Sequence, residues 1–180
     1  MKGIKFLGNS KLEMADLPDP EVGPGDILVR VKASAICGSE METFIPPGGL
    51  DGNPGHEVMG VVEDPNGSKR FKKGDRVGVA TLQGCGGCFW CLQGKQDFCK
   101  KASVLRNAHS EYVVGQEIWM QPVPDDISDS LAVMLAGDGM GVPYGASVRS
   151  GVKPGDITCV FGAGPVGQGM AMIQTFIGAR

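Results

Sequence analysis

The segment Lys73-Gly74-Asp75-Arg76-Val77-Gly78-Val79 joins a Gly-Asp pair to a run of β-branched residues. Two further copies of this pattern are Pro24-Gly25-Asp26-Ile27-Leu28-Val29 and Pro154-Gly155-Asp156-Ile157-Thr158-Cys159-Val160. Each copy predicts a tight turn that leads into a β-strand, because glycine and aspartate favour turns and β-branched residues favour strands. The copies are unevenly spaced, so they indicate shared turn chemistry and not a domain repeat.

The high glycine content supports a β-rich fold. Glycine accounts for 29 of the 180 residues, proline for 12, and hydrophobic residues for 42%. This composition argues against a helical bundle and is typical of a turn-rich β domain with a packed core. We expect further strands at residues 57–63 and 111–114, so residues 1–125 are predicted to be mostly β.

Helical patterns are confined to the last third of the sequence. A helix is predicted at residues 129–136, where Ser128 or Ser130 can cap the first turn. Its apolar residues share one face and are Leu131, Met134 and Leu135. A second helix is expected at residues 144–149.

The charge balance excludes two classes of partner. Lys and Arg total 17 against 20 Asp and Glu, a net charge of −3 that offers no basic surface to nucleic acids or anionic membranes. No apolar stretch approaches the roughly 18 residues of a membrane helix, and the start resembles no secretory signal. We therefore expect a soluble cytoplasmic chain, in which six cysteines favour metal binding over disulfides.

Four cysteines lie in one glycine-rich loop with the spacing C-x2-C-x2-C-x7-C, at Cys85, Cys88, Cys91 and Cys99. Four thiolates can surround zinc at about 2.3 Å each and leave no position for a substrate. Disulfides are disfavoured in a reducing compartment, and ferredoxin-type clusters have three residues before the fourth cysteine instead of seven. The spacing predicts a structural zinc ion in a lobe at residues 84–100.

Five motifs, in order along the whole chain, resemble those of the zinc-dependent medium-chain alcohol dehydrogenase and reductase family. They are Cys37-Gly38-Ser39, Gly55-His56-Glu57-Val58-Met59-Gly60, Lys73-Gly74-Asp75-Arg76-Val77, the four-cysteine loop and Gly162-Ala163-Gly164-Pro165-Val166-Gly167. The resemblance implies a GroES-like β-barrel as the catalytic domain at residues 1–150. It also implies that residues 151–180 are the first strand and helix of a Rossmann nucleotide-binding domain.

The same resemblance implies a catalytic zinc ion bound by Cys37 and His56, although a lone cysteine or histidine is more often structural. Asp138 stands at the position of the third ligand, as in branches of the family that oxidise secondary alcohols or polyols. Ser39 stands where the family has a hydroxyl that takes the substrate proton. Glu57 stands where the family has a glutamate that can approach the metal.

The expected proton path departs from the family's pattern at one position. A histidine often follows three residues after the hydroxyl, whereas this chain has Glu42 there. The proton would pass either to Glu42 or to water. The only other histidine, His109, lies in a different motif, and we expect it at a strand edge.

The C-terminal motif predicts an apolar strand at residues 157–161, followed by a glycine turn and a helix. Cys159 lies inside this strand and is expected to be a buried core residue. The apolar face of that helix comprises Val166, Met170, Ile173 and Ile177. This context predicts pyrophosphate binding by Gly162, Gly164, Pro165, Val166 and Gly167. The acidic residue that distinguishes NAD from NADP is expected about 20 residues further on, past Arg180, so both cofactors stay open.

We therefore predict the N-terminal part of a zinc-dependent oxidoreductase that interconverts an alcohol or polyol and its carbonyl compound with NAD(P). One strand and one helix cannot cover their own apolar faces, so this chain alone is expected to bind zinc but to show little or no activity. The alternative is a non-enzymatic zinc-binding domain that folds or associates without a working cofactor site. A zinc-free reductase is disfavoured because all three ligands are present, and assembly into a homo-oligomer stays open.

Overall fold

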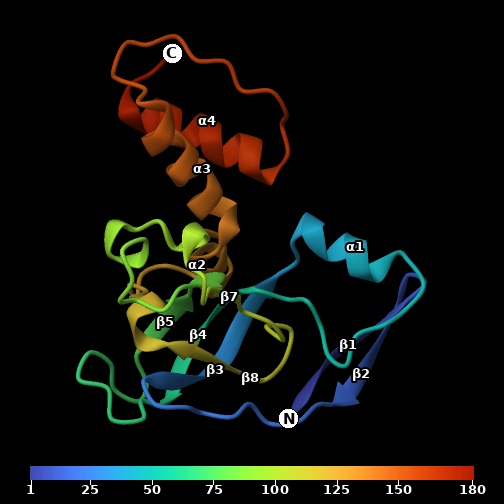
Figure 1. The fold of residues 1–180 in the computed structure, drawn as a ribbon. Coiled ribbons are helices and arrows are strands. Elements are labelled where there is room, and N and C mark those ends of the chain that lie inside the picture. Colours follow the sequence, from blue (N-terminus) through green and yellow to red (C-terminus); the bar gives the residue numbers. More distant parts are fainter.

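A computed structural model describes residues 1–180, and its body is a curled antiparallel β-sheet (Figure 1). The five strands follow the order β8-β3-β4-β5-β9. They are β3 (Asp26–Ala35), β4 (Glu57–Asp64), β5 (Arg76–Val79), β8 (Tyr112–Gln116) and β9 (Met120–Pro122). Two short pairs accompany the sheet, β1 (Lys2–Gly8) with β2 (Lys11–Asp16) and β6 (Leu82–Gln83) with β7 (Ser103–Val104). The prediction of a mostly β body is confirmed.

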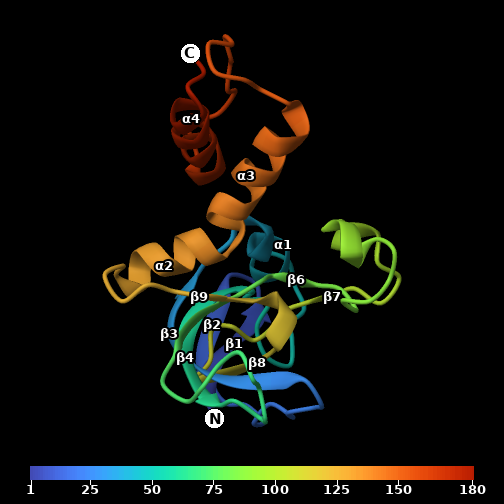
Figure 2. The same cartoon turned by 90° about the vertical axis from the view of Figure 1, so that its left-hand side faces the viewer.

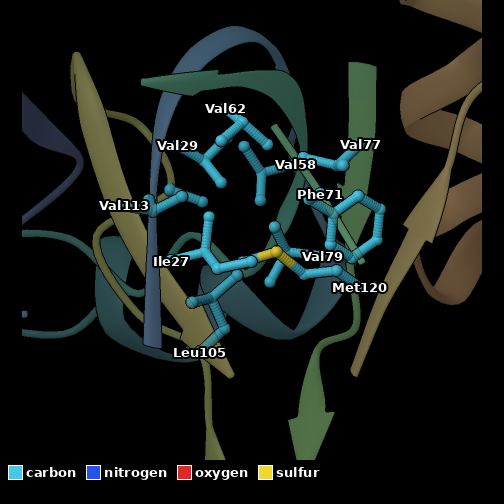
Figure 3. Packing of buried hydrophobic residues seen from close by; sticks show 11 residues of the cluster. Ile27, Val29, Val58, Val62, Phe71, Val77, Val79, Leu105, Val113 and Met120 are labelled. Carbon is cyan, nitrogen blue, oxygen red and sulfur yellow. The ribbon is translucent and has the colours of Figure 1, made fainter. Parts of the chain in front are cut away.

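The hydrophobic core lies between the strands of this curled sheet (Figure 3). Successive side chains of a strand point to opposite faces, so Ile27 and Val29 of β3 and Val77 and Val79 of β5 all point inward. The eleven buried members of the cluster are Ile27, Val29, Val58, Val62, Phe71, Val77, Val79, Leu105, Ala108, Val113 and Met120. The close packing of this core holds the strands of the sheet, and therefore their ends, rigidly in place.

Helix α2 (Asp129–Ala136) packs its Ala132 and Val133 against Met59 of β4. Of the predicted apolar face, Met134 packs against this cluster, but the two leucines do not. Leu131 and Leu135 are 51% and 45% exposed. The helix approaches the sheet closely through small residues, since a Cβ on Gly78 of β5 would lie 2.2 Å from the Ala136 Cβ. The larger leucines therefore lie on the outer side.

The remaining helices are α1 (Met41–Phe44), α3 (Asp138–Ser150) and α4 (Pro165–Ile177). Helix α3 begins six residues before its predicted start, and Gly151 caps its C-terminal end with a left-handed φ of 66°. Helices α3 and α4 pack against each other and project from the sheet at the end opposite the N-terminus (Figure 2). No helix combines the length and the apolarity that crossing a membrane requires.

The predicted strand at residues 157–161 does not form. This segment has no strand hydrogen bonds, and Ile157 and Phe161 are 89% and 94% exposed. Cys159, expected in the core, is exposed as well. A strand needs a neighbour, and within these 180 residues the segment finds only backbone bonds between Thr158 and Arg180 and between Arg180 and Asp156.

Candidate metal centres

Two neighbouring strand ends bring Cys37 and His56 together. Strands β3 and β4 are antiparallel, and their register pairs Ala35 with Glu57. Cys37 follows the end of β3 by two residues, and His56 comes directly before β4. Residues far apart in the sequence therefore meet at one corner of the sheet.

Asp138 reaches the same corner from the turn between α2 and α3. It is the first residue of α3, and Gly137 before it is in extended conformation. The ligand atoms of Cys37, His56 and Asp138 all lie within 4.8 Å of one another, and Asp138 Oδ2 is 3.8 Å from His56 Nε2. The structure thus brings together the three residues that the sequence predicts as catalytic zinc ligands.

The His56 ring is oriented for metal binding. Its Nδ1 lies 2.9 Å from the Pro54 carbonyl oxygen, which can only accept, so Nδ1–H donates there and Nε2 is the nitrogen left to bind a metal. His56 is buried, whereas Cys37 and Asp138 are partly exposed. A thiolate, an imidazole and a carboxylate form a donor set that fits zinc and leaves one coordination position for a substrate.

The other residues predicted for the active site are Ser39, Glu57 and Glu42, and they differ in how they contact the three ligands. Ser39 Oγ donates to Cys37 Sγ at 3.3 Å, so the hydroxyl lies beside the ligand set. Glu57 is buried, and its Oε2 accepts a hydrogen bond from the Gly139 N–H in the first turn of α3 at 3.4 Å. Glu42 is exposed on α1 and makes no hydrogen bond to Ser39 or to the three ligands.

Sequence reasoning missed a buried pair behind Cys37. Glu40 Oε2 lies 2.8 Å from His109 Nε2, and Glu40 Oε1 accepts the Cys37 N–H at 3.0 Å. Burial opposes ionisation of Glu40, but hydrogen bonds from His109 and Cys37 outweigh it and lower its pKa. His109 lies shortly before the start of β8, near the strand edge where it was expected, and its side chain is buried. The pair is separated by 69 residues, so no local pattern indicates it.

The four cysteines of the lobe also come together, in the loop between β6 and β7 that extends to one side of the sheet (Figure 2). Their sulfur atoms lie within 4.8 Å of one another. A Cβ on Gly84 would lie 2.5 Å from Cys91 Sγ, so a glycine is needed there. All four donors come from the protein, and the set therefore suits a closed structural zinc site.

The thiols of the lobe differ in acidity. The N–H groups of Gly87 and Cys88 donate to Cys85 and lower its pKa to about 6. Burial raises the pKa of Cys91 to about 11. The N–H groups of Cys85 and Lys101 donate to Cys99 and lower its pKa. Part of the site is thus already anionic near neutral pH.

The predicted phosphate-binding turn leads directly into the first turn of α4. Gly162 has a φ of 107°, and Gly164 precedes α4 without a side-chain cap. A Cβ on Gly167 would lie 1.9 Å from the Gly162 carbonyl oxygen, so only glycine fits there. Pro165 and Val166 form the first turn of the helix, whose free N–H groups can receive an anion.

Comparisons with known proteins point to one family. A family model described as the alcohol dehydrogenase GroES-like domain matches residues 23–125. The L-threonine 3-dehydrogenase of Chromobacterium violaceum is 32% identical over 198 residues, which cover 100% of this chain and 55% of the relative. The zinc-type alcohol dehydrogenase B of Aspergillus flavus is 34% identical over 184 residues, covering 93% of this chain and 43% of the relative. The chain thus spans about half the length of these curated relatives.

Solved structures share the fold over the whole chain. The alcohol dehydrogenase TADH from Thermus sp. ATN1 has a TM-score of 0.89 at 26% identity, covering 99% of this chain and 56% of that structure. A structure described as an NAD-dependent alcohol dehydrogenase has a TM-score of 0.85 at 30% identity, covering 100% of this chain and 56% of that structure. The curled β body and the helices that follow it therefore have counterparts in these dehydrogenases.

Proposed function

Because the chain belongs to the alcohol dehydrogenase family that carries the GroES-like domain, we propose that it forms the zinc-binding part of a dehydrogenase. The reaction proposed is the interconversion of an alcohol or polyol and its carbonyl compound with NAD or NADP. The observation that supports it best is the meeting of Cys37, His56 and Asp138 within 4.8 Å. The buried His56 ring meets a thiol and a carboxylate here, a combination that a bound metal ion would stabilise.

Each residue of the proposed active site has a separate task. Cys37, His56 and Asp138 hold the metal, and a zinc ion bound there would act as a Lewis acid toward a substrate oxygen. Ser39 takes the hydroxyl proton of the substrate, because its Oγ lies beside the ligand set, 3.3 Å from Cys37 Sγ. Glu57 holds the first turn of α3, and with it Asp138, through the Gly139 N–H. The exposed Glu42 or water then receives the proton.

We assign the second zinc ion to Cys85, Cys88, Cys91 and Cys99, where it would order the lobe at residues 84–100. We also infer that residues 151–180 begin a nucleotide-binding domain that follows a catalytic domain at residues 1–150. Gly162, Gly164, Pro165, Val166 and Gly167 would hold the pyrophosphate of NAD(P) at the N-terminus of α4. The close glycine contact at Gly167 and the structural similarity to an NAD-dependent alcohol dehydrogenase support this assignment.

Zinc content and activity, measured together in the protein that carries this chain, test the proposal. The wild-type protein should contain two zinc ions per chain and reduce NAD or NADP with secondary alcohols or polyols. Cys37→Ala should lose one zinc ion and at least a hundredfold in kcat/KM, whereas Cys88→Ala should lose the other zinc ion and destabilise the lobe. Two zinc ions and full activity in Cys37→Ala would refute the assignment.

A further inference from the structure

His109 lies between the two loops that carry the proposed ligands Cys37 and His56. Its side chain is 5% exposed, and its ring is stacked on Phe6, with ring centroids 6.4 Å apart and planes 15° apart. Its two nitrogen atoms bond in opposite directions, Nε2 to Glu40 and Nδ1 to the Ser34 hydroxyl, each at 2.8 Å. The ring is therefore fixed on every side.

Toward Cys37, His109 acts through Glu40. The Glu40 side chain is fully buried, so its two carboxylate oxygens depend on donors from the protein. One oxygen accepts from His109 Nε2, and the other accepts the Cys37 N–H at 3.0 Å. The His109 imidazole thus positions the Glu40 carboxylate, and this carboxylate positions the backbone of Cys37.

Toward His56, the contact is made by the ring itself and by Asn53. A Cβ on Gly55 would lie 2.8 Å from His109 Nε2, so the residue before His56 packs directly on the ring. Asn53 Oδ1 accepts the backbone N–H groups of both Gly55 and His109, at 3.2 and 3.1 Å. The backbone that leads into His56 is therefore tied to His109.

We propose that His109 is a positioning residue of the metal centre, because one imidazole ring joins the Cys37 loop to the His56 loop. This inference rests on the proposed function, since it assumes that the two loops share a metal ion. Without the ring's N–H, a buried carboxylate oxygen of Glu40 would lose its donor, and the Cys37 loop would be free to shift. A shift of one ligand relative to the other weakens metal binding at this centre and leaves the distant lobe unaffected.

The experiment is 113Cd NMR of the chain, with a chelator competing for cadmium. Cadmium bound by four thiolates and cadmium bound by one thiolate, an imidazole and a carboxylate give separate resonances, so both sites are read in one sample. In His109→Phe, cadmium affinity at the Cys37 site should fall about tenfold or more, the range known for partners that orient ligands. The affinity of the four-cysteine site should not change.

Two further variants separate positioning from stability. His109→Gln keeps a donor for Glu40 and should recover part of the affinity, whereas Ser34→Ala removes only the outer hydrogen bond and should stay near wild type. Unchanged affinity in His109→Phe would overturn the proposal. Equal loss at both sites, with His109→Gln no better than His109→Phe, would show a merely structural role and overturn it too. A wild-type spectrum with no resonance that Cys37→Ala removes would refute the metal site itself, and the role of His109 with it.

Discussion

Gly137 allows the turn between α2 and α3 to approach Glu57 closely, and this turn positions Asp138. A Cβ at Gly137 would lie 2.7 Å from Glu57 Oε2 and 3.0 Å from its Cγ. We predict that Gly137→Ala displaces Glu57, lowers the free energy of unfolding by about 1–3 kcal/mol and weakens metal binding at Asp138. Denaturant unfolding and zinc competition measure the two effects.

Gly141 in α3 provides the matched control for this substitution. Nothing lies within 4 Å of the position of its Cβ, and alanine is the better helix former. Gly141→Ala should therefore stabilise the protein by up to about 1 kcal/mol and leave metal affinity unchanged. Equal destabilisation by both substitutions would show that the turn over Glu57 has no special role.

The acidity of the lobe cysteines predicts how its zinc affinity depends on pH. Cys91, with a pKa of about 11, is protonated at neutral pH without metal, so zinc must displace at least that proton. The affinity should fall as the pH falls, and more steeply below the Cys85 pKa of about 6, where a second thiol becomes protonated. Calorimetry in buffers of different ionisation enthalpy should detect proton release. An affinity independent of pH would contradict this account.

Some single residues are predictable from local sequence because their partners are local. In all three Gly-Asp copies the aspartate accepts an N–H from three residues earlier, at Asp26 (3.1 Å), Asp75 (2.9 Å) and Asp156 (2.8 Å). The glycine before each aspartate has a positive φ, so the predicted turns are confirmed. The partners of Glu40 and His109 are set by the folded sheet, which no local pattern reports.

At the level of elements, the start of α2 depends on one hydroxyl. Ser128 Oγ accepts the Leu131 N–H at 3.3 Å, whereas Ser130 Oγ contacts only the Ser128 hydroxyl. Ser128→Ala should lower the free energy of unfolding by about 1 kcal/mol, the usual effect of losing an N-cap. Ser130→Ala should have little effect or stabilise slightly, since alanine favours helix. A similar decrease in the free energy of unfolding in both variants would show that Ser128 is not the N-cap of α2.

The three Gly-Asp copies also show why elements are harder to predict than turns. The first two lead into β3 and β5, each of which finds strands on both sides. The third has the same β-branched pattern but no neighbouring strand, and residues 157–161 remain without sheet structure. Local preference thus indicated the turn correctly, and pairing at longer range decided whether a strand followed.

At the level of the whole molecule, the two candidate metal centres differ in how far the sequence alone identifies them. The four cysteines of the lobe lie in one loop, so their spacing was sufficient to predict a site. Cys37, His56 and Asp138 come from the end of β3, the start of β4 and the start of α3. Only the resemblance to a family linked them, because nothing in their spacing shows that these three segments meet.

The position of zinc in a crystal, from anomalous diffraction at the zinc absorption edge, tests the central claim most directly. We predict two peaks, one among the sulfur atoms of Cys85, Cys88, Cys91 and Cys99. The second should lie between Cys37 Sγ, His56 Nε2 and an Asp138 oxygen, with one coordination position not taken by the protein. A single peak in the lobe, or a second zinc ion that Asp138 does not contact, would contradict the account.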